Sequence, residues 1–426
     1  MKAETRFIRQ IQKMANDKEF QNKHVTNAAK DFKRTRKLTF SDVIMYTIGN
    51  TRSPLELEAK RFSKHLTTDE ISGAALCKAR QKIKYTAYEE LFKQTAVTSP
   101  RDKRFHGYHL YAVDGMKGEL PKTPELSTKY CESEKCRTPV FHAVSAFDVL
   151  NELFIRSEFH FGAADERALA GKMIDDVIQD VHYKYEPQIW IFDRGFPSLS
   201  LIQKLLEHQL YFVMRVSSSF LKEVNEFRKS KYVDRQIHIE YSAKRAAANH
   251  VNSNGINEFD LRCVRIKLPN GKDEILITNL ERKKFPKRDI KEIYRLRWGI
   301  ETSFNYLKNA IYVEEFVSKT ENGLAQDYYV SLLVYNFTTC ICGSMYPDIP
   351  KKRKYKYKIN RRTATRLIYH NLEDVLFKST PSLLRTLNAL KSDIIKHLSP
   401  IRPNRSFPRN FDSSRHSICH SRAALS

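Results

Sequence analysis

A succession of short apolar segments between residues 108 and 216 constrains the fold of this chain more than any other feature. These segments are rich in strand-forming residues, which predicts strands. Between the later strands, apolar residues recur every three to four positions, which predicts helices. In chain order the predicted elements are three strands, then a helix, a strand, a helix and a strand, at Tyr108–Val113, Val140–Phe147, Leu153–Phe161, Asp165–Tyr183, Ile189–Phe192, Leu199–His208 and Leu210–Val216. This order predicts an α/β sheet whose strand ends can present acidic residues.

The segments that flank this core have different periodicities. Residues 1–100 have helical spacing, and residues 220–280 are rich in strand-forming residues. The predicted elements are three helices, two strands and a later helix, at Leu38–Ile48, Leu55–Phe62, Ala74–Ile83, Phe259–Leu268, Glu274–Thr278 and Asp289–Ala310. A helical amino-terminal region and a β-rich insertion are therefore expected beside the sheet.

The charge balance of the chain is strongly basic. Its 426 residues include 74 Lys and Arg against 49 Asp and Glu, a formal net charge of +25. Counterion release lets such a surface bind nucleic acid before any sequence is read, so DNA or RNA is a more fitting partner than an acidic membrane. The segment Lys351–Arg366 holds nine of the cations, with Tyr355 and Tyr357 among them. This segment suits phosphate contact with stacking as well as it suits a solvated tail.

One predicted amino-terminal helix carries a cluster of polar and basic side chains. Ser72 has the residue type of an N-cap for this helix. The helix then presents Lys78, Arg80, Gln81 and Lys82. These side chains suit a helix-turn-helix reader of a DNA major groove, and they suit a plain basic helix face equally well.

Apolar and cysteine patterns indicate a cytoplasmic protein without a membrane span. The residues Met1–Lys37 contain no apolar run that resembles a signal peptide. The longest apolar stretch, Tyr328–Met345, is interrupted by polar residues, which predicts a buried helix. The seven cysteines are expected to be reduced, and the two close pairs have too few neighbouring ligands for a tetrahedral metal site. These pairs are Cys131 with Cys136 and Cys340 with Cys342.

Two aspartates follow predicted strands of the core. Asp114 comes directly after the strand that ends at Val113, and Gly115 behind it permits a turn. Asp193 follows Ile189–Phe192 in the same way. Either one alone is also consistent with an ordinary turn aspartate. Both are expected to be exposed at a strand end, where carboxylates can hold divalent ions.

The later helix carries the densest cluster of functional candidates in the chain. Tyr294, Arg297, Glu301 and Lys308 are separated by three, four and seven residues, so helical geometry places them on one face. A salt-bridged solvent face is the simplest explanation of such spacing, because Arg and Glu four residues apart pair readily. A phosphate site is the alternative, because Arg can grip a phosphate with two parallel donors and Lys supplies a point charge.

Together these residues resemble the DDE transposases of bacterial insertion sequences, and specifically the family-four class marked by Tyr-x2-Arg-x3-Glu-x6-Lys. The spacing of Tyr294, Arg297, Glu301 and Lys308 matches this motif. Two strand-end aspartates and a β-rich insertion precede the glutamate, as in the family. The resemblance covers about Tyr108 to Tyr312 and implies an RNase H-like catalytic core with helical regions at both ends.

Residue by residue, the resemblance implies that Asp114, Asp193 and Glu301 are the catalytic residues and hold two Mg2+ ions, with Mn2+ as a substitute. Tyr294, Arg297 and Lys308 would contact phosphates of the transposon end. Trp298 would stack on a base displaced from the duplex, and a core tryptophan is the alternative reading. The implied organisation begins with a helical DNA-binding region at 1–100. The catalytic core follows in two parts, at 101–219 and 281–320, with the β-rich insertion at 220–280 between them. A basic helical region at 321–426 completes the chain.

The resemblance also implies partners and an activity. A homodimer would bind the inverted repeats of double-stranded DNA at the element's ends, cleave them and join the 3′ hydroxyls to target DNA, without any membrane. The alternatives are a transposase-derived DNA-binding protein without catalysis and an RNase H-like nuclease of another role. The presence of all three acidic residues favours catalysis over the first alternative, and the four-residue motif argues against the second.

Overall fold

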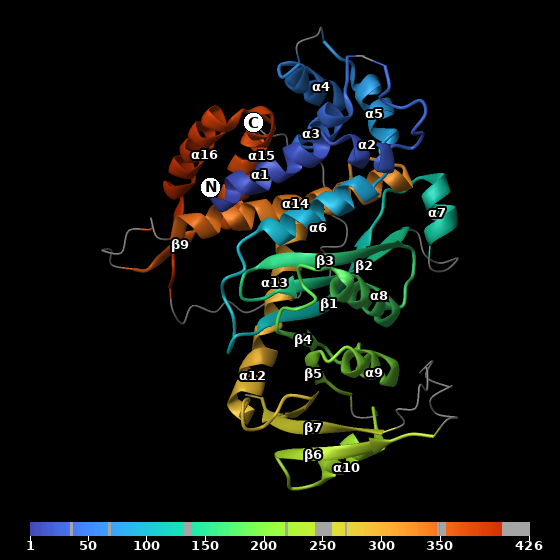
Figure 1. The fold of residues 1–426 in the computed structure, drawn as a ribbon, viewed down its shortest axis with the longest axis vertical. Helices are drawn as coiled ribbons and strands as arrows, with labels where there is room; N and C mark the ends of the chain where they lie inside the picture. The colour runs from blue at the N-terminus through green and yellow to red at the C-terminus, as the bar shows by residue number, and fades with distance from the viewer. Residues whose placement is uncertain are drawn as a thin grey trace.

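One eight-stranded sheet forms the centre of the molecule (Figure 1). The computed structural model describes residues 1–34, 37–66, 70–131, 138–217, 220–242, 258–268, 271–346, 349 and 355–402. The strands of the sheet are β1 His109–Glu119, β2 Val140–Asp148, β3 Leu153–Phe161, β4 Gln188–Phe192, β5 Tyr211–Arg215, β6 Asp234–Glu240, β7 Glu258–Lys267 and β8 Asp273–Thr278. Every strand predicted from the sequence is present, with boundaries that shift by a few residues, and β6 is an additional strand.

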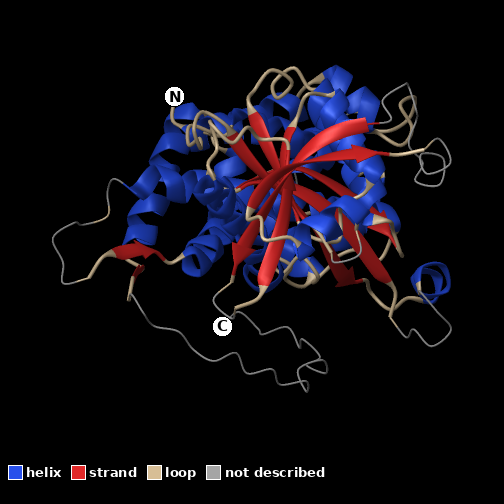
Figure 2. Cartoon of the chain, turned by 90° about the horizontal axis from the view of Figure 1, so that it is seen from below, coloured by secondary structure: helices blue, strands red, loops and turns tan. Residues whose placement is uncertain are grey.

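The order of the strands is β3-β2-β1-β4-β5-β8-β7-β6. β1, β2 and β3 are antiparallel neighbours, whereas β4 and β5 run parallel to β1. This is the arrangement of an RNase H-like core, so the predicted fold class is confirmed. The predicted insertion supplies β6, β7 and β8, which pair onto β5 and extend the same twisted sheet (Figure 2).

Alternating side chains of the strands build a separate core on each face of the sheet. Tyr111 and Val113 point to one face, where they pack with α8 and α9. Leu110 and Ala112 point to the other face, toward α12 and α13. The helices on the two faces are α8 Glu166–Gln179, α9 Leu199–Glu207, α10 Lys222–Lys229, α12 Lys287–Leu296 and α13 Trp298–Tyr306, which a π-helical turn, η1 Leu307–Ile311, continues.

A second layer of helices lies above the sheet and contains both the amino-terminal and the carboxy-terminal regions (Figure 1). Its elements are α1 Ala3–Ala15, α2 Lys18–His24, α3 Phe40–Gly49, α4 Leu55–Ser63, α5 Gly73–Gln81, α6 Thr86–Thr98, α14 Glu321–Met345, α15 Arg361–Phe377 and α16 Thr380–Ile395. The helix α7 Pro124–Tyr130 and the small pair β9 Tyr357–Ile359 with β10 Leu398–Pro400 complete the described elements. The three amino-terminal helices predicted from the sequence correspond to α3, α4 and α5.

The long helix α14 joins these layers. Its side chains are buried along most of its length, as predicted for Tyr328–Met345. Its Asn336 accepts a hydrogen bond from the backbone N–H of Phe154 at 3.0 Å and donates one to the carbonyl of the same residue at 2.8 Å. These bonds satisfy the backbone N–H and C=O of Phe154 on the outer edge of β3, where no further strand pairs. Among the described helices, none is long and apolar enough to cross a membrane.

The structure changes the interpretation of the basic helix α5. Ser72 does cap it, because its hydroxyl accepts from the backbone N–H of Ala75 at 3.3 Å. Arg80, however, points inward and is 8% exposed, with its guanidinium 2.5 Å from Asp327 and 2.6 Å from Gln326 of α14. The expectation that Arg80 joins a DNA-reading face was therefore wrong. The reason is that a buried carboxylate in the neighbouring helix gives this arginine a partner inside the protein.

Part of the basic segment Lys351–Arg366 also has an internal role. Residues 351–354 lie outside the described residues. Arg361 forms an ion pair with Glu152 at 2.6 Å and lies over the rings of Tyr306 and Tyr335. This arginine stabilises the junction of α14, α15 and β3, and is not part of a solvated tail.

A buried carboxylate between α4 and α15 gives a prediction about stability. Glu373 is 3% exposed and accepts a hydrogen bond from Arg61 at 2.6 Å. Burial raises the pKa of Glu373 to about 7, against the lowering effect of Arg61. Because the folded pKa lies above the ordinary value, this group's stabilising contribution is full below pH 4.5 and is lost as the pH rises through 7. We expect the free energy of unfolding of the wild type to fall between pH 5 and pH 8 by about 2 kcal/mol more than that of Glu373→Gln.

Urea denaturation at the two pH values measures this difference. Asp393→Asn is the matched control, because this carboxylate lies on α16 and is 55% exposed. Equal pH dependence in the wild type and in Glu373→Gln would show that Glu373 titrates normally.

Candidate active site

A buried arginine lies between two of the predicted catalytic carboxylates. The guanidinium of Arg297 donates to Glu301 at 2.5 Å and to Asp114 at 3.3 Å. Its side chain is 7% exposed, whereas the two carboxylates remain 30% and 22% exposed. The pairing of Arg297 with Glu301 that the spacing predicted is present, but Asp114 of the sheet shares the same cation. The helix face therefore faces the sheet and not the solvent.

Asp114 lies in the middle of a strand and not at its end. β1 continues to Glu119 in unbroken pairing with β2, whereas its other neighbour β4 stops opposite Val113. Asp114 is thus the first residue of β1 without a partner on that side. The expected turn at Gly115 is absent. The carboxylate of Glu166 in α8 lies where a Cβ at position 115 would be, so Gly115 packs against this side chain within the strand instead of forming a turn.

Asp193 lies directly after β4, as predicted, and is one register step beyond the Val113–Phe192 pair. Since β1 and β4 are parallel neighbours, roughly 5 Å apart, Asp114 and Asp193 are adjacent on one face of the sheet. The hydroxyl of Tyr294 donates to Asp193 at 2.9 Å. The two strands therefore bring together carboxylates that are far apart in sequence.

The two aspartates differ in their acidity. Burial raises the pKa of Asp114 to about 6, although Arg297 opposes this effect, and the neighbouring charges of Glu301 and Asp193 add to it. Burial also acts on Asp193, but the backbone N–H of Arg194, the charge of Arg297 and the hydroxyl of Tyr294 together lower its pKa. Of the two aspartates, Asp114 is held less easily as an anion, and a cation brought beside it would lower its pKa.

The helical path that carries the motif has a break. The predicted helix over Asp289–Ala310 is divided into α12 and α13 at Arg297, whose backbone keeps right-handed helical angles. Tyr294, Arg297 and Glu301 face the aspartates across this junction. Lys308 lies further on, in η1, where it donates to the carbonyl of Lys117 at 2.8 Å and pairs with Glu314 at 2.8 Å. It approaches β1 three residues, or roughly 10 Å, beyond Asp114.

The motif neighbour Trp298 is 51% exposed, so the interpretation of it as a core tryptophan was wrong.

Arg215 is a further basic residue beside the site. It ends β5, the parallel neighbour of β4, and lies 3.6 Å from Asp193 and 3.1 Å from Glu274. Sequence reasoning did not single out Arg215. Its position at the end of the strand next to β4 was the signal that could have identified it.

The site offers the ligand type of hard divalent cations. Asp114 and Glu301 contact the guanidinium of Arg297, and Asp193 lies beside Asp114 in the sheet. Carboxylate oxygens are the ligands that Mg2+ prefers. Among the described residues, no three His, Cys, Asp or Glu side chains lie close enough together to hold one metal ion. In this arrangement Arg297 supplies the positive charge that the carboxylates need. Cys77, Cys263, Cys340 and Cys342 are free thiols.

Comparison with known families agrees with this geometry. The family model described as a transposase DDE domain matches residues 88–337, which include α6, the whole sheet and most of α14. This chain belongs to the DDE transposase family. The resemblance inferred from Tyr294, Arg297, Glu301 and Lys308 is thereby confirmed, and enzymes of this family generally use divalent metal ions.

Two curated relatives of the DDE transposase are distant. The putative transposase of insertion sequence element IS4SA from Synechocystis is 24% identical over 229 residues, which cover 51% of this chain and 60% of the relative. The transposase InsG of insertion sequence element IS4 from Escherichia coli K12 is 20% identical over 320 residues, or 71% of this chain and 70% of the relative. The match thus spans less than two thirds of the Synechocystis protein.

Among solved structures, the piggyBac transposase in a synaptic complex with hairpin DNA has a TM-score of 0.47 and 15% identity to this DDE transposase. The similarity covers 95% of this chain and 88% of that chain.

Proposed function

We propose that this protein is an active DNA transposase that binds the terminal inverted repeats of its insertion sequence, cleaves the ends and joins their 3′ hydroxyls to target DNA. The observation that carries the proposal is the sharing of Arg297 by Asp114 and Glu301, with Asp193 in the next register position of the sheet. Arg297 thus draws two acids from separate parts of the chain together, beside a third on the neighbouring strand. Magnesium-dependent phosphodiester cleavage and strand transfer require such a centre.

The three carboxylates are the proposed metal ligands. Two Mg2+ ions, or Mn2+ in their place, would activate the attacking oxygen and stabilise the leaving oxygen. Asp114 and Asp193 contribute from adjacent strands, and Glu301 contributes from the helix that faces them. Because all three are partly exposed, a phosphate of DNA can reach them from the solvent.

The motif side chains are proposed to hold the DNA. Arg297 and Tyr294 each donate a hydrogen bond to a carboxylate in this structure, and a phosphate oxygen can accept the same bonds. Lys308 would contact a phosphate further along the strand, since it lies roughly 10 Å beyond Asp114. Trp298 offers an exposed aromatic surface beside Arg297, on which a displaced base can stack.

The proposed partners are double-stranded DNA, at the transposon ends and the target, and a second copy of this chain in the end complex. The net charge of +25 supports binding to DNA before the ends are recognised. The proposed location is the bacterial cytoplasm, where the nucleoid supplies this substrate.

The proposal is tested by incubating the purified protein with linear DNA that carries the two ends of the element in which its gene lies. We expect nicks at the element's ends in Mg2+ and none in EDTA. Cleavage of unrelated DNA at the same rate would identify a nuclease without end recognition. End binding without any cleavage in Mg2+ or Mn2+ would identify a DNA-binding protein that has lost catalysis.

A further inference from the structure

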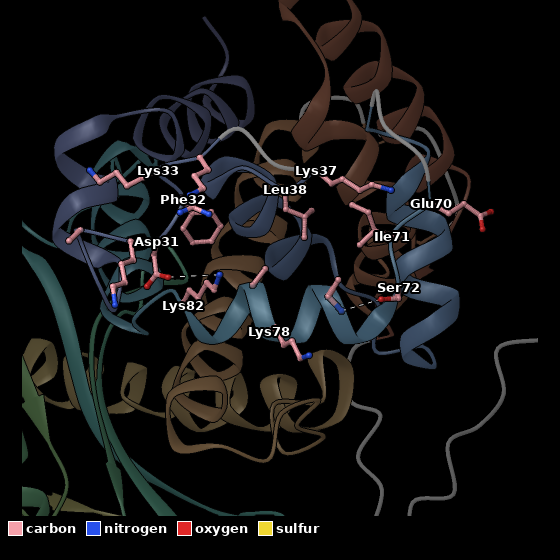
Figure 3. Close-up of a pocket in the computed structure, with 15 residues that line it drawn as sticks. Asp31, Phe32, Lys33, Lys37, Leu38, Glu70, Ile71, Ser72, Lys78 and Lys82 are labelled. Carbon is pink, nitrogen blue, oxygen red and sulfur yellow. Dashed lines mark hydrogen bonds and ion pairs between the residues drawn. The ribbon is translucent and has the colours of Figure 1, made fainter.

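A cleft of about 990 Å³ opens between α5 and the segment that joins α2 to α3 (Figure 3). Its lining residues do not include Asp114, Asp193 or Glu301. Among the residues that the structure describes, the charged lining of the cleft consists of six cations and two acids, namely Lys30, Lys33, Arg34, Lys37, Lys78, Lys82, Asp31 and Glu70. Such an excess of positive charge in a concave site favours an anionic ligand. The volume lies at the upper end of the roughly 300–1,000 Å³ that enclose small ligands.

The cations of the cleft are only partly neutralised. Lys82 lies 3.9 Å from Asp31, which is a long ion pair. Lys30, Arg34 and Lys78 have no ion-pair partner within the part of the chain that the structure describes. Three full positive charges are therefore available to a ligand with several phosphates.

One wall of the cleft is held rigidly. Ala75, Ala79 and Lys82 line it from one face of α5. The opposite face carries Arg80, which is bound to Asp327 and Gln326 of α14. A wall that is fixed in this way loses little conformational entropy when a ligand binds.

The cleft also has an apolar lining. Phe32 and Leu38 are half-buried, and Ile71 is 6% exposed. The ring of Phe32 packs edge-on against Phe40, with centroids 5.8 Å apart, and its backbone is held in the left-handed region at φ 54°. A non-glycine residue rarely adopts this backbone conformation, so the surrounding structure must hold Phe32 in it. A ligand that covers this lining gains stabilisation only if it carries flat or apolar groups as well as charge.

We infer that this cleft binds an unpaired DNA strand, with phosphates at the basic rim and bases against the apolar lining. A duplex presents phosphates and sugars but keeps its base faces stacked inside, so it would leave the exposed parts of Phe32 and Leu38 facing water. A recognition helix must also protrude to enter a major groove roughly 12 Å wide. Here the face of α5 with Lys82 is a cleft wall, opposite the segment with Lys33 (Figure 3). The site goes beyond the proposed function, because it uses none of the carboxylates.

Fluorescence anisotropy in EDTA tests the inference. The probes are a short labelled single strand, the blunt duplex of the same sequence, and an abasic strand with the same phosphates. The test variant combines Lys30→Ala, Arg34→Ala and Lys78→Ala. The matched control combines Lys13→Ala, Lys18→Ala and Lys60→Ala, which removes the same charge from exposed positions outside the cleft.

We expect the test variant to bind the single strand about tenfold more weakly than the control, with a log–log salt slope smaller by about 2. The abasic strand should bind the wild type more weakly than the normal strand. Equal affinities of the test and control variants, both folded by circular dichroism, would overturn the inference. Preference for the duplex, or equal binding of the abasic strand, would overturn the assignment to an unpaired strand. Glu301→Gln should bind the single strand like the wild type, so loss of cleavage and loss of this site are separable.

Discussion

Asp114→Asn, Asp193→Asn and Glu301→Gln will each lower magnesium-dependent cleavage of end DNA by about 10³-fold or more. Each change removes one anionic oxygen from the proposed metal ligands while it preserves the shape of the side chain. Binding of uncleaved end DNA should stay within about threefold of the wild type, because the phosphate contacts are assigned to Tyr294 and Arg297. Single-turnover cleavage of end-labelled DNA and a parallel binding assay measure the two quantities.

Glu292→Gln is the matched control for these variants, because this carboxylate lies on α12 but is 53% exposed, and its ion pair among the described residues is with Arg295. It should cleave like the wild type.

Asp114→Asn also separates catalysis from folding. The folded pKa of Asp114 is about 6, above the ordinary 3.8, so its ionisation costs folding free energy above pH 6. Its thermal midpoint at pH 8 should therefore not fall below that of the wild type. Wild-type cleavage by any of the three variants would remove that residue from the site.

Arg297→Ala will weaken cleavage and end binding together, by about 10²-fold in cleavage and with a salt slope reduced by about 1. The guanidinium is the best-buried cation of the site and has two carboxylate partners. When DNA binds, a phosphate would replace one of those carboxylates as its acceptor. A binding isotherm that matches the wild type at the same salt concentration would contradict this role.

A second readout of Arg297 does not depend on cleavage. In the free protein its guanidinium is the cation beside Asp114 and Glu301, so it competes with a metal ion for these oxygens. We expect Arg297→Gln to bind Mn2+ more tightly than the wild type in the absence of DNA, as measured by electron paramagnetic resonance. Arg295→Ala is the control, since this neighbour is 71% exposed and contacts none of the three acids. Equal Mn2+ affinity in the wild type and Arg297→Gln would show that the guanidinium does not compete.

Local patterns predicted most of the fold correctly, because periodicity reports which side of an element is buried. The strand Leu153–Phe161 was predicted with the observed boundaries, and Tyr328–Met345 forms a buried helix as expected. What the patterns did not show is how distant elements meet. The strands of the insertion pair onto β5 and extend the central sheet, and this pairing depends on long-range hydrogen bonds that leave no mark in the local sequence.

The details of the site that could not be predicted have the same origin. Gly115 resembles a turn residue in sequence, but it lies inside β1, where it pairs with Val144 of β2 and contacts the carboxylate of Glu166 from α8. Arg80 resembles part of a DNA-reading helix, but Asp327 holds it inside the protein. Arg215 has no motif around it, yet it lies beside Asp193 because β5 is the neighbour of β4. In each case the deciding partner is far away in the chain.

The sequence alone determined the class of fold, the positive charge and the set of residues in the motif, since these depend on composition, periodicity and spacing. The spacing of Tyr294, Arg297 and Glu301 was enough to place them on one helical face. Only the tertiary structure decided which surface that face meets. It turns toward Asp114 and Asp193 because β1 and β4 are parallel neighbours in register and α12 and α13 pack on that side of the sheet. Burial there makes Arg297 a shared partner of two carboxylates, whereas the same residues on an exposed helix would form an ordinary surface ion pair.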